Sequence, residues 1–520
     1  MRELYLPTGN EYVSLPDISE RTAAIWSFSC LHMGAKGLVE FHGDGSVPVM
    51  APFVHSRGAN LPLTDIVWQR LEYWAPEFTA HAGSLTVRGT ILAPVGERGF
   101  IYRLSLENPT ASAIDAAYGL SGLWAGARVC INESREIRGE MSVTDSLWNS
   151  GPVFELSCGL PFLAFAPMCE REIDAVHAET GAGTSYRLTR CVTLGPGESE
   201  SCCFYWGLGY EEVAAATSAK EMLRQGWNHE LKTTLDYLRC RSWHTDDAHL
   251  RALYNTNLFF CIFYSTGRTI DTEELVLVTS RSPRYYVSAA YWDRDSLFWS
   301  FPGILDADAA LAREMLLYAF GRQGRNIGTH SRFIDGTVLE PGFELDELVA
   351  PVIALERYVK ATGDESVLAI PDVAAGVERI LHTLNSMRHD SEWLYETFLM
   401  PTDDMHTYPY LSYDNVLVWR ALRALARLYP ARCGALAQEA EAVREAVYRF
   451  CTDEGEFGRY FVWSTDLAGH SDVYDEPPGS LLLLPYLGFC AADDPIWLNT
   501  ARMIRSPDYA YSLPIANSPT

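Results

Sequence analysis

The hydrophobic pattern of the chain changes its period once, near Tyr210, and this change limits the possible folds. Before that point, apolar and polar residues alternate, or β-branched residues follow one another, in short segments that turn-forming residues separate. The clearest strand-like segments are residues 23–30, 84–93, 100–106 and 186–194. Because these segments show little helical periodicity, we expect residues 1–210 to form a β-sandwich domain.

After Tyr210 the apolar residues recur at helical spacing almost to the last residue. Residues 211–243 fit one or two linker helices, and residues 244–520 fit a helical catalytic domain. The candidate helices after the linker are 246–264, 289–302, 306–320, 344–361, 373–388, 412–428, 434–450, 479–489 and 495–505. Helices of similar length predict an array of hairpins. Since the loops hold the unusual polar residues, we expect the functional site at one end of the array.

The chain is strongly acidic, with a formal net charge of −26 and an isoelectric point near 4.9. Nucleic acid and anionic membranes require a basic face, so we expect neither as a partner, whereas a neutral small molecule fits. No apolar segment has the length of a signal-peptide core or a membrane span, which predicts a cytoplasmic protein. The 12 cysteines and 13 histidines include no CxxC or HExxH spacing, so we expect no metal and no cofactor.

Aromatic and charged residues are interleaved in the segment from Tyr291 to Trp299. Arg294 offers a fixed fork of donors and Asp295 an acceptor, so the two can hold neighbouring hydroxyl groups of a sugar. Trp292 and Tyr291 would then contact the sugar ring. The alternative is an ion pair on a solvated helix face, and the aromatic side chains argue against a fully solvated face.

Another segment, residues 340–347, carries four carboxylates and opens a predicted helix. The helix dipole favours acids in a first turn whatever their purpose, so each could be structural. Four carboxylates exceed what capping needs, and we expect Glu344 and Asp346 to line a cleft. Tyr474, in the aromatic and acidic segment 472–488, is a further candidate binding residue.

Asp403 and Asp404 are adjacent, and His406 and Tyr408 follow them just before the predicted helix 412–428. Two neighbouring carboxylates repel each other, so the pKa of one should rise above that of the other. A raised pKa suits a general acid that works near neutral pH. The alternative is a solvated cap that supplies negative charge to the helix N-terminus.

Four motifs, in the same order, resemble those of the metal-independent exo-α-mannosidases, glycoside hydrolase family 125. They are Trp-Asp-Arg-Asp-Ser at 292–296, Phe-Glu-Leu-Asp-Glu-Leu at 343–348 with Lys-Ala-Thr-Gly-Asp at 360–364, Phe-Leu-Met-Pro-Thr-Asp-Asp at 398–404, and Leu-Leu-Leu-Pro-Tyr-Leu-Gly-Phe at 482–489 with Asp-Pro-Ile at 494–496. The resemblance covers residues 287–517, which is under half of the chain.

The resemblance implies an (α/α)6 barrel of six helical hairpins and an inverting exo-α-glycoside hydrolase, with α-mannosidase as the first expectation for its activity. Such an enzyme uses one carboxyl group to protonate the leaving oxygen and a second, about 6.5–9.5 Å away, to activate water. The acid then maps to the Asp403 and Asp404 pair, with Asp403 as first choice and Asp404 holding a hydroxyl group. The terminal sugar would be held by Tyr291, Trp292, Arg294, Asp295, Glu344, Asp346, His406, Tyr408 and Tyr474.

Two features depart from the family pattern. The nine predicted helices fall short of the twelve in a closed barrel. Residues 515–520 resemble a family segment that is followed, in the family, by the last helices and the catalytic Glu. We therefore expect a barrel without its last helices and its usual base. The polypeptide is then a truncated product, another residue such as Asp335 or Glu340 is the base, or the protein binds carbohydrate without turnover.

The predicted β-sandwich lies outside the minimal catalytic unit of the resembling family. A sandwich, linker helices and a helical barrel in this order resemble the layout of bacterial glucoamylases, family 63 glucosidases and sugar phosphorylases. The terminal sugar could therefore be glucose instead of mannose. The sequence carries no indication of the oligomeric state.

Overall fold

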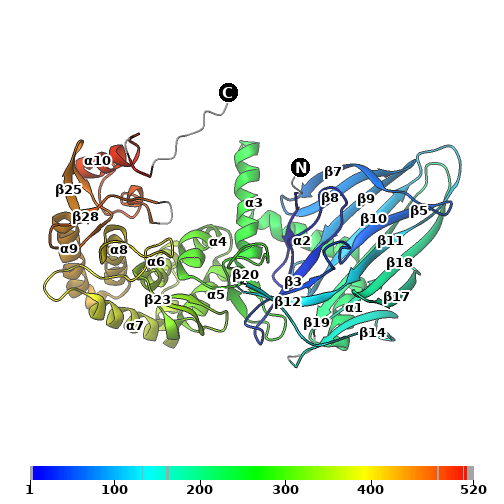
Figure 1. The fold of residues 1–520 in the computed structure, drawn as a ribbon, viewed down its shortest axis with the longest axis horizontal. Helices are drawn as coiled ribbons and strands as arrows, with labels where there is room; N and C mark the ends of the chain where they lie inside the picture. Colours follow the sequence, from blue (N-terminus) through cyan, green and yellow to red (C-terminus); the bar gives the residue numbers. More distant parts are fainter. Residues whose placement is uncertain (1–3, 132, 160–162, 477–478, 508, 512–520) are drawn as a thin grey trace. The chain divides into compact units, whose positions relative to one another are not determined.

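The computed structural model describes residues 4–511, apart from 132, 160–162, 477–478 and 508. Backbone packing divides the chain into two compact units, Met1–Ala290 and Tyr291–Thr520 (Figure 1). The resemblance at residues 515–520 lies outside the described residues. Within the part that is described, no helix combines the length and apolarity needed to cross a bilayer.

The first unit is built mainly from three large antiparallel sheets, which confirms the predicted β-sandwich. The six-stranded sheet contains β1 (Thr8–Gly9), β2 (Val13–Leu15), β3 (Ser27–His32), β4 (Gly37–His42), β12 (Gly126–Ile131) and β13 (Glu133–Glu136). The eight-stranded sheet has the order β14 (Glu140–Ser146), β15 (Gly151–Ser157), β16 (Leu163–Cys169), β19 (Ser199–Gly209), β10 (Gly99–Glu107), β9 (Leu85–Leu92), β8 (Ala75–Ala82) and β7 (Leu63–Leu71). The five-stranded sheet has the order β17 (Asp174–Thr180), β18 (Gly183–Leu194), β11 (Ile114–Trp124), β5 (Ala51–Ser56) and β6 (Ala59–Asn60).

Aromatic side chains from different sheets form the core of this unit. Phe28 of β3 lies 5.3 Å from Phe165 of β16, measured between ring centroids, and Phe165 stacks on Phe154 of β15 at 4.6 Å. The alternation along each strand sends every second side chain inward, so the inner faces are apolar. Cys202 and Cys203 follow this rule, because they belong to apolar clusters on opposite faces of β19.

Helices α1 (Glu212–Gln225) and α2 (Trp227–Arg241) occupy the predicted linker, and the chain continues through α3 (Ala248–Tyr264), β20 (Thr266–Arg268) and β21 (Leu275–Leu277). The two compact units divide after Ala290, later than the boundary at residue 244 that the change to helical pattern suggested. The reason is that α3 packs on the first unit: Trp74 stacks on Phe263 at 5.3 Å and meets Phe260 edge to face at 5.2 Å.

The second unit consists of helices that alternate with loops and short strands. Its helices are η1 (Arg294–Ser300), α4 (Phe301–Ala307), α5 (Ala309–Phe320), α6 (Leu345–Thr362), α7 (Pro371–Met387), α8 (Ser412–Leu428), α9 (Cys433–Phe450) and α10 (Pro495–Ile504), with short 3-10 turns η2 (Gly324–Asn326), η3 (Glu365–Ala369), η4 (Pro430–Arg432) and η6 (Leu481–Leu483). Its strands are β22 (Thr329–Arg332), β23 (Val338–Phe343), β24 (Tyr410–Leu411), β25 (Thr452–Gly455), β26 (Gly458–Phe461), β27 (Ser464–Thr465) and β28 (Ser471–Asp472).

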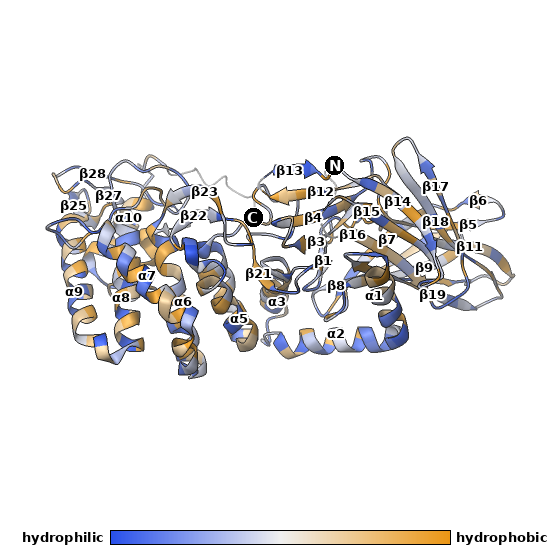
Figure 2. Cartoon of the chain, turned by 90° about the horizontal axis from the view of Figure 1, so that it is seen from below, coloured by the Kyte–Doolittle hydropathy of each residue, from blue (hydrophilic) through white to orange (hydrophobic). Residues whose placement is uncertain are grey.

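The helices of the second unit form hairpins with an inner layer. Helix α6 packs against α8 on one side and against η1, α4 and α5 on the other, while α9 pairs with α8. Figure 2 shows apolar colour on the packed faces of these helices, whereas α2 of the first unit is mostly hydrophilic. The first turns of η1, α6 and α8 carry buried acidic or basic residues, so the charged side chains lie at the N-terminal end of the inner layer.

Two predicted helices differ from the structure. The predicted helix 289–302 begins only at Arg294, and its first part is the π-helix η1, a form that is frequent at functional sites. The predicted helix 479–489 is wrong, because only Leu481–Leu483 form a 3-10 turn there. A longer helix does not form, because Pro485 has no backbone N–H to donate and Gly488 has a φ of +77°.

Candidate active site

Arg294, at the start of η1, lies at the centre of a buried charged network. Its Nη1 donates to Glu344 Oε2 at 2.9 Å and to Asp346 Oδ2 at 2.8 Å. Its Nη2 donates to Asp403 Oδ1 at 2.5 Å. The guanidinium is only 2% exposed, so these contacts form in a medium of low dielectric constant. Three segments that are far apart in the sequence therefore meet at one side chain.

A second layer of charges holds η1 in place. The carboxylate of Glu347 accepts hydrogen bonds from the backbone N–H groups of Asp293 and Arg294, which caps the first turn of η1. The Asp293 carboxylate accepts from Arg332 of β22 and from the Tyr291 hydroxyl. These side chains are fully buried, so they fix the direction in which Arg294 points.

Asp403 lies in a loop with an unusual backbone conformation. Its φ is +68°, in the left-handed region that few residues other than glycine adopt, although Asp tolerates it better than most. Burial raises the pKa of the Asp403 carboxyl, and the charge of Asp346 raises it further, against the opposing effects of Arg294 and His330. Residues in strained conformations cluster at functional sites, which makes this loop a candidate for chemistry.

His330 of β22 connects three carboxyl groups of the site. Its Nδ1 lies 2.6 Å from Glu344 Oε1 and 3.8 Å from Asp403 Oδ1, and its Nε2 lies 3.5 Å from Glu340 Oε2. Burial lowers the pKa of His330, but the hydrogen bond with Glu344 and the surrounding carboxylates outweigh burial and raise it. The imidazole therefore keeps its proton to a higher pH than a free histidine.

Negative groups outnumber positive groups in this network. The carboxyl groups are Asp293, Asp295, Glu344, Asp346, Glu347, Asp403 and Asp414, and the cations are Arg294, Arg332 and His330. Burial raises the pKa of Asp295 to about 7, and repulsion by Asp403 adds to this. Both carboxyl oxygens of Asp414 are buried without a hydrogen-bond partner among the described residues. Some of these carboxyl groups must therefore hold protons at neutral pH.

Two groups of side chains have the composition of a cation site. Ligand atoms of His330, Glu344 and Asp403 lie within 4.8 Å of one another, and the same holds for Glu344 with Asp346 and Glu347. The guanidinium of Arg294 already donates to Glu344, Asp346 and Asp403, so a fixed protein cation compensates these carboxylates.

The structure brings together Arg294, Glu344, Asp346 and Asp403, as the sequence predicted. Asp295 belongs to the same network through its electrostatic coupling to Arg294 and Asp403. Asp404 is exposed, and its charge reaches Tyr474, where it adds to the effect of burial in raising the pKa of the phenol.

Other predicted binding residues have structural partners instead. Tyr291 is fully buried and hydrogen-bonds Asp293, so it supports the network from the core. Trp292 is 2% exposed and meets the His330 ring edge to face at 5.5 Å. His406 uses both ring nitrogens to bind backbone carbonyl groups of its own loop, and Tyr408 stacks on His470.

Sequence reasoning missed His330, Arg332, Asp293, Glu347 and Asp414 as members of the site. Asp293, Glu347 and Asp414 adjoin motifs that were singled out, and their position in the first turn of an apolar helix could have indicated burial. His330 and Arg332 lie on a short strand without any motif, and no local signal identifies them.

The two proposed substitutes for a catalytic base differ in their surroundings. Asp335 accepts hydrogen bonds from the backbone N–H and the hydroxyl of Thr337 in its own turn. Glu340 accepts from Ser331 at 3.0 Å and lies beside His330, so one imidazole ring separates its carboxylate from Asp403. Glu340 therefore reaches the network through His330.

Comparison with known families identifies the segment that contains Asp403 and Asp404. The model of the metal-independent alpha-mannosidases (GH125) matches residues 392–514. This segment is similar to that glycoside hydrolase family, and the match covers about a quarter of the chain. The predicted resemblance is thereby confirmed for the C-terminal part of the chain, while a comparison with curated proteins gives no match.

Solved structures extend the likeness to the N-terminal unit. A bacterial glucoamylase complexed with acarbose is 13% identical, with a TM-score of 0.58 over 97% of this chain and 79% of that chain. A kojibiose phosphorylase candidate from the human microbiome is 11% identical, with a TM-score of 0.54 over 88% of this chain and 69% of that chain. At these identities the likeness shows the fold alone, a β-sandwich followed by a domain of helical hairpins.

A metal-independent α-mannosidase of Streptococcus pneumoniae, solved in a non-productive complex with α-1,6-mannobiose, is also similar. It is 20% identical, and the match covers 53% of this chain and 76% of that chain with a TM-score of 0.44.

Proposed function

We propose that the C-terminal unit is a metal-independent, inverting exo-α-mannosidase that removes a terminal sugar from a small mannoside. The observation that carries the proposal is the contact of Arg294 with Glu344, Asp346 and Asp403 at one end of the inner helices. The family match to residues 392–514, which include Asp403, supports α-mannosides as the first substrate class.

In the proposed mechanism Asp403 is the general acid. Its partial burial and raised pKa favour a protonated carboxyl group, which can pass its proton to the glycosidic oxygen as the bond breaks. Asp404, which is exposed beside it, would hold a hydroxyl group of the substrate.

Arg294 and Asp295 would hold the terminal sugar. The guanidinium is fixed by Glu344 and Asp346, so it loses little freedom when a sugar hydroxyl binds to it. With a pKa of about 7, Asp295 can accept a hydrogen bond when ionised or donate one when protonated.

Glu340 is the proposed base within the described residues. An inverting enzyme needs a second carboxylate about 6.5–9.5 Å from the acid, which leaves room for the attacking water. Glu340 lies across the His330 ring from Asp403, and its side chain is 42% exposed, so water can reach it. Replacement by Gln should therefore remove hydrolysis while leaving substrate binding intact.

The proposal is tested by incubating the full chain with aryl α-mannosides and α-glucosides and following the first released sugar by proton NMR. We expect hydrolysis of the mannoside, with the β-anomer appearing first and no effect of a chelator. Faster hydrolysis of the glucoside would replace mannose by glucose. Binding of mannose without hydrolysis would identify a carbohydrate-binding protein and overturn the enzymatic proposal.

A further inference from the structure

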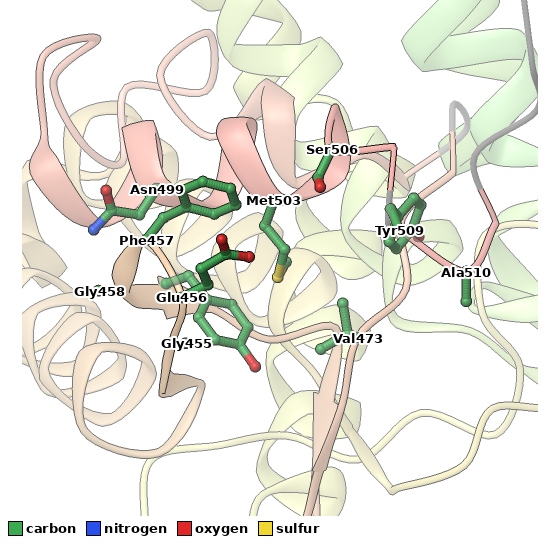
Figure 3. Close-up of a pocket in the computed structure, with 11 residues that line it drawn as sticks. Gly455, Glu456, Phe457, Gly458, Val473, Asn499, Met503, Ser506, Tyr509 and Ala510 are labelled. Atoms are coloured by element: carbon green, nitrogen blue, oxygen red, sulfur yellow. The ribbon is translucent and has the colours of Figure 1, made fainter.

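A cavity lies apart from Arg294, between the β25–β26 hairpin, α10 and the residues that follow α10. Its volume is about 330 Å³. Figure 3 shows Met503 of α10 between Glu456 of the hairpin and Tyr509. A cavity of this size is at the lower end of the range of about 300–1,000 Å³ for small-molecule sites, which fits a ligand of one or two sugar rings.

The walls of this cavity combine aromatic faces with a few polar groups. Phe457, Tyr460 and Tyr509 contribute rings, and Glu456 and Asn499 contribute a carboxylate and an amide. The Asn499 side chain is oriented by a hydrogen bond from its Nδ2 to the backbone oxygen of Arg459 at 3.0 Å. A sugar ring has apolar C–H faces and a rim of hydroxyl groups, so it matches this combination of stacking surfaces and hydrogen-bonding groups.

The charge of the cavity selects among ligands of this size. Glu456 is exposed at the wall, and no Lys or Arg is among the described residues that line the cavity. The chain as a whole carries a formal charge of −26. A phosphate or another anionic group would be repelled, whereas a neutral sugar would not.

A row of aromatic rings leads from the cavity to Tyr474, which the charge of Asp404 reaches. Val473 lines the cavity, and the next residue, Tyr474, is electrostatically coupled to Asp404. The Tyr474 ring lies 4.8 Å from the Tyr511 ring, and Tyr511 lies 5.6 Å from Tyr509, measured between centroids. Tyr509 itself lines the cavity, so the row is continuous.

We propose that this cavity binds a sugar residue on the leaving-group side of the bond that is cleaved. The inference rests on the proposed function, because an exo-acting enzyme holds the terminal sugar at Arg294 and the remainder of the chain must leave past the acid. The charge of Asp404, a member of the acid pair, reaches Tyr474, and the row of rings from Tyr474 through Tyr511 to Tyr509 would guide the leaving chain to the cavity. The substrate is then a neutral oligosaccharide of at least three residues.

The test compares the hydrolysis of substrates of different lengths by the full chain and two variants. We expect kcat/KM to rise from an aryl α-mannoside through α-mannobiose to α-mannotriose. Phe457→Ala and Tyr509→Ala should each lose up to about tenfold on mannotriose, which is what one ring contact contributes, and nothing on the aryl mannoside. Tyr486→Ala is the matched control, because Tyr486 is 69% exposed in the same unit and does not line the cavity.

The outcomes separate the cavity from the catalytic proposal. An equal loss on all substrates, or no gain with chain length in the unaltered protein, would overturn the subsite. If no substrate is hydrolysed, the proposed function fails. Titration calorimetry with mannotriose then tests separately whether the cavity binds a sugar. Binding that Phe457→Ala weakens and Tyr486→Ala leaves unchanged would support it, and binding that is equal in both variants, or no binding, would refute it. Phe457 is 38% exposed, so its replacement leaves the core intact.

Discussion

Each of the two units contains an arginine that is almost completely buried, and the two have opposite surroundings. Arg281 in the first unit donates from Nη1 to the backbone oxygens of Asn10 at 2.5 Å and Phe263 at 2.9 Å. Burial lowers its pKa to about 10. Burial also acts on Arg294, but the charges of Asp346, Glu347 and other carboxylates outweigh it and raise the pKa of that guanidinium.

The difference separates an arginine that holds the fold from one that belongs to a charged site. Carbonyl groups carry no net charge, so Arg281 joins the segment at Asn10 to the segment 263–266, and among the described residues its hydrogen-bond acceptors are all backbone oxygens. Arg294 lies among more carboxylates than it can neutralise. An arrangement of this kind costs stability, because buried ions are expensive unless they are fully paired. Its presence at one end of the inner helices is best explained by chemistry at that end.

The largest expected effect concerns the acid next to Arg294. Asp403→Asn keeps the size of the side chain and removes the transferable proton, so kcat for an aryl α-mannoside should fall by about 10²–10⁴-fold. Asp404→Asn should cost less, because Asp404 is proposed only to hold a hydroxyl group. Steady-state kinetics at several pH values would check both. A larger loss in Asp404→Asn would exchange the two roles.

The second prediction compares the two arginines directly. Arg294→Met should lower kcat/KM by about 10²-fold, because the sugar and Asp403 lose their common donor. Arg281→Met should leave the kcat/KM of the folded protein unchanged and lower the free energy of unfolding by about 1–3 kcal/mol, since buried carbonyl groups lose their donor. Kinetics and thermal unfolding of both variants provide the measurement. An activity loss in Arg281→Met that stability does not explain would break the comparison.

These two arginines also show where the sequence was sufficient. Arg294 stands within a charged and aromatic motif, and the motif indicated that it meets the carboxylates of the other segments. Arg281 gave no such signal, because its partners are backbone atoms of Asn10 and Phe263, which no pattern near residue 281 can reveal. The packing of α3 on Trp74 gave no local signal either, because the two are far apart in the sequence.

Adjacency in the sequence predicted which segments form the site better than it predicted where each side chain points. Glu344, Asp346 and Asp403 were expected in one cleft and contact one guanidinium. His406, in the same motif as Asp403, is turned toward carbonyl groups of its own loop. Spacing shows which segments meet, but the direction of a loop side chain depends on backbone angles such as the φ of +68° at Asp403.

The third prediction concerns stability and pH, and it follows from the surplus of acids around Arg294. The pKa of Asp295 is about 7 in the folded chain, raised by burial from 3.8. Between these pH values the folded chain holds a proton that the unfolded chain has lost, so stability falls as the pH rises from about 4 to 7. Asp295→Asn removes this contribution. The loss of stability over that window, measured by chemical denaturation, should be smaller in the variant.

If the stability of Asp295→Asn and that of the unaltered chain changed equally with pH, the raised pKa of Asp295 would be contradicted. The matched control is Glu365→Gln, because Glu365 is exposed at the start of the η3 turn, outside the network. This variant should keep the pH dependence of the unaltered chain.

The smallest expected effect comes from replacing a buried histidine. His330 in the second unit is compared with His32 in the first. His330 lies among the carboxylates of the site, and its positive charge opposes the rise in the pKa of Asp403. His330→Gln keeps a hydrogen-bonding group and removes that charge, so the pKa of Asp403 should rise further. The alkaline limb of kcat/KM, which reports loss of the proton from the acid, should then move to higher pH by less than about one unit.

His32 is the control, since it is fully buried in the first unit with its Nδ1 at 3.3 Å from Asp271, and burial lowers its pKa. His32→Gln should leave the pH profile unchanged, whatever it does to stability. A profile that moves to lower pH in His330→Gln would mean that the imidazole itself supplies the proton. A profile that does not move at all would mean that, of the two described cations beside Asp403, Arg294 and not His330 sets its acidity.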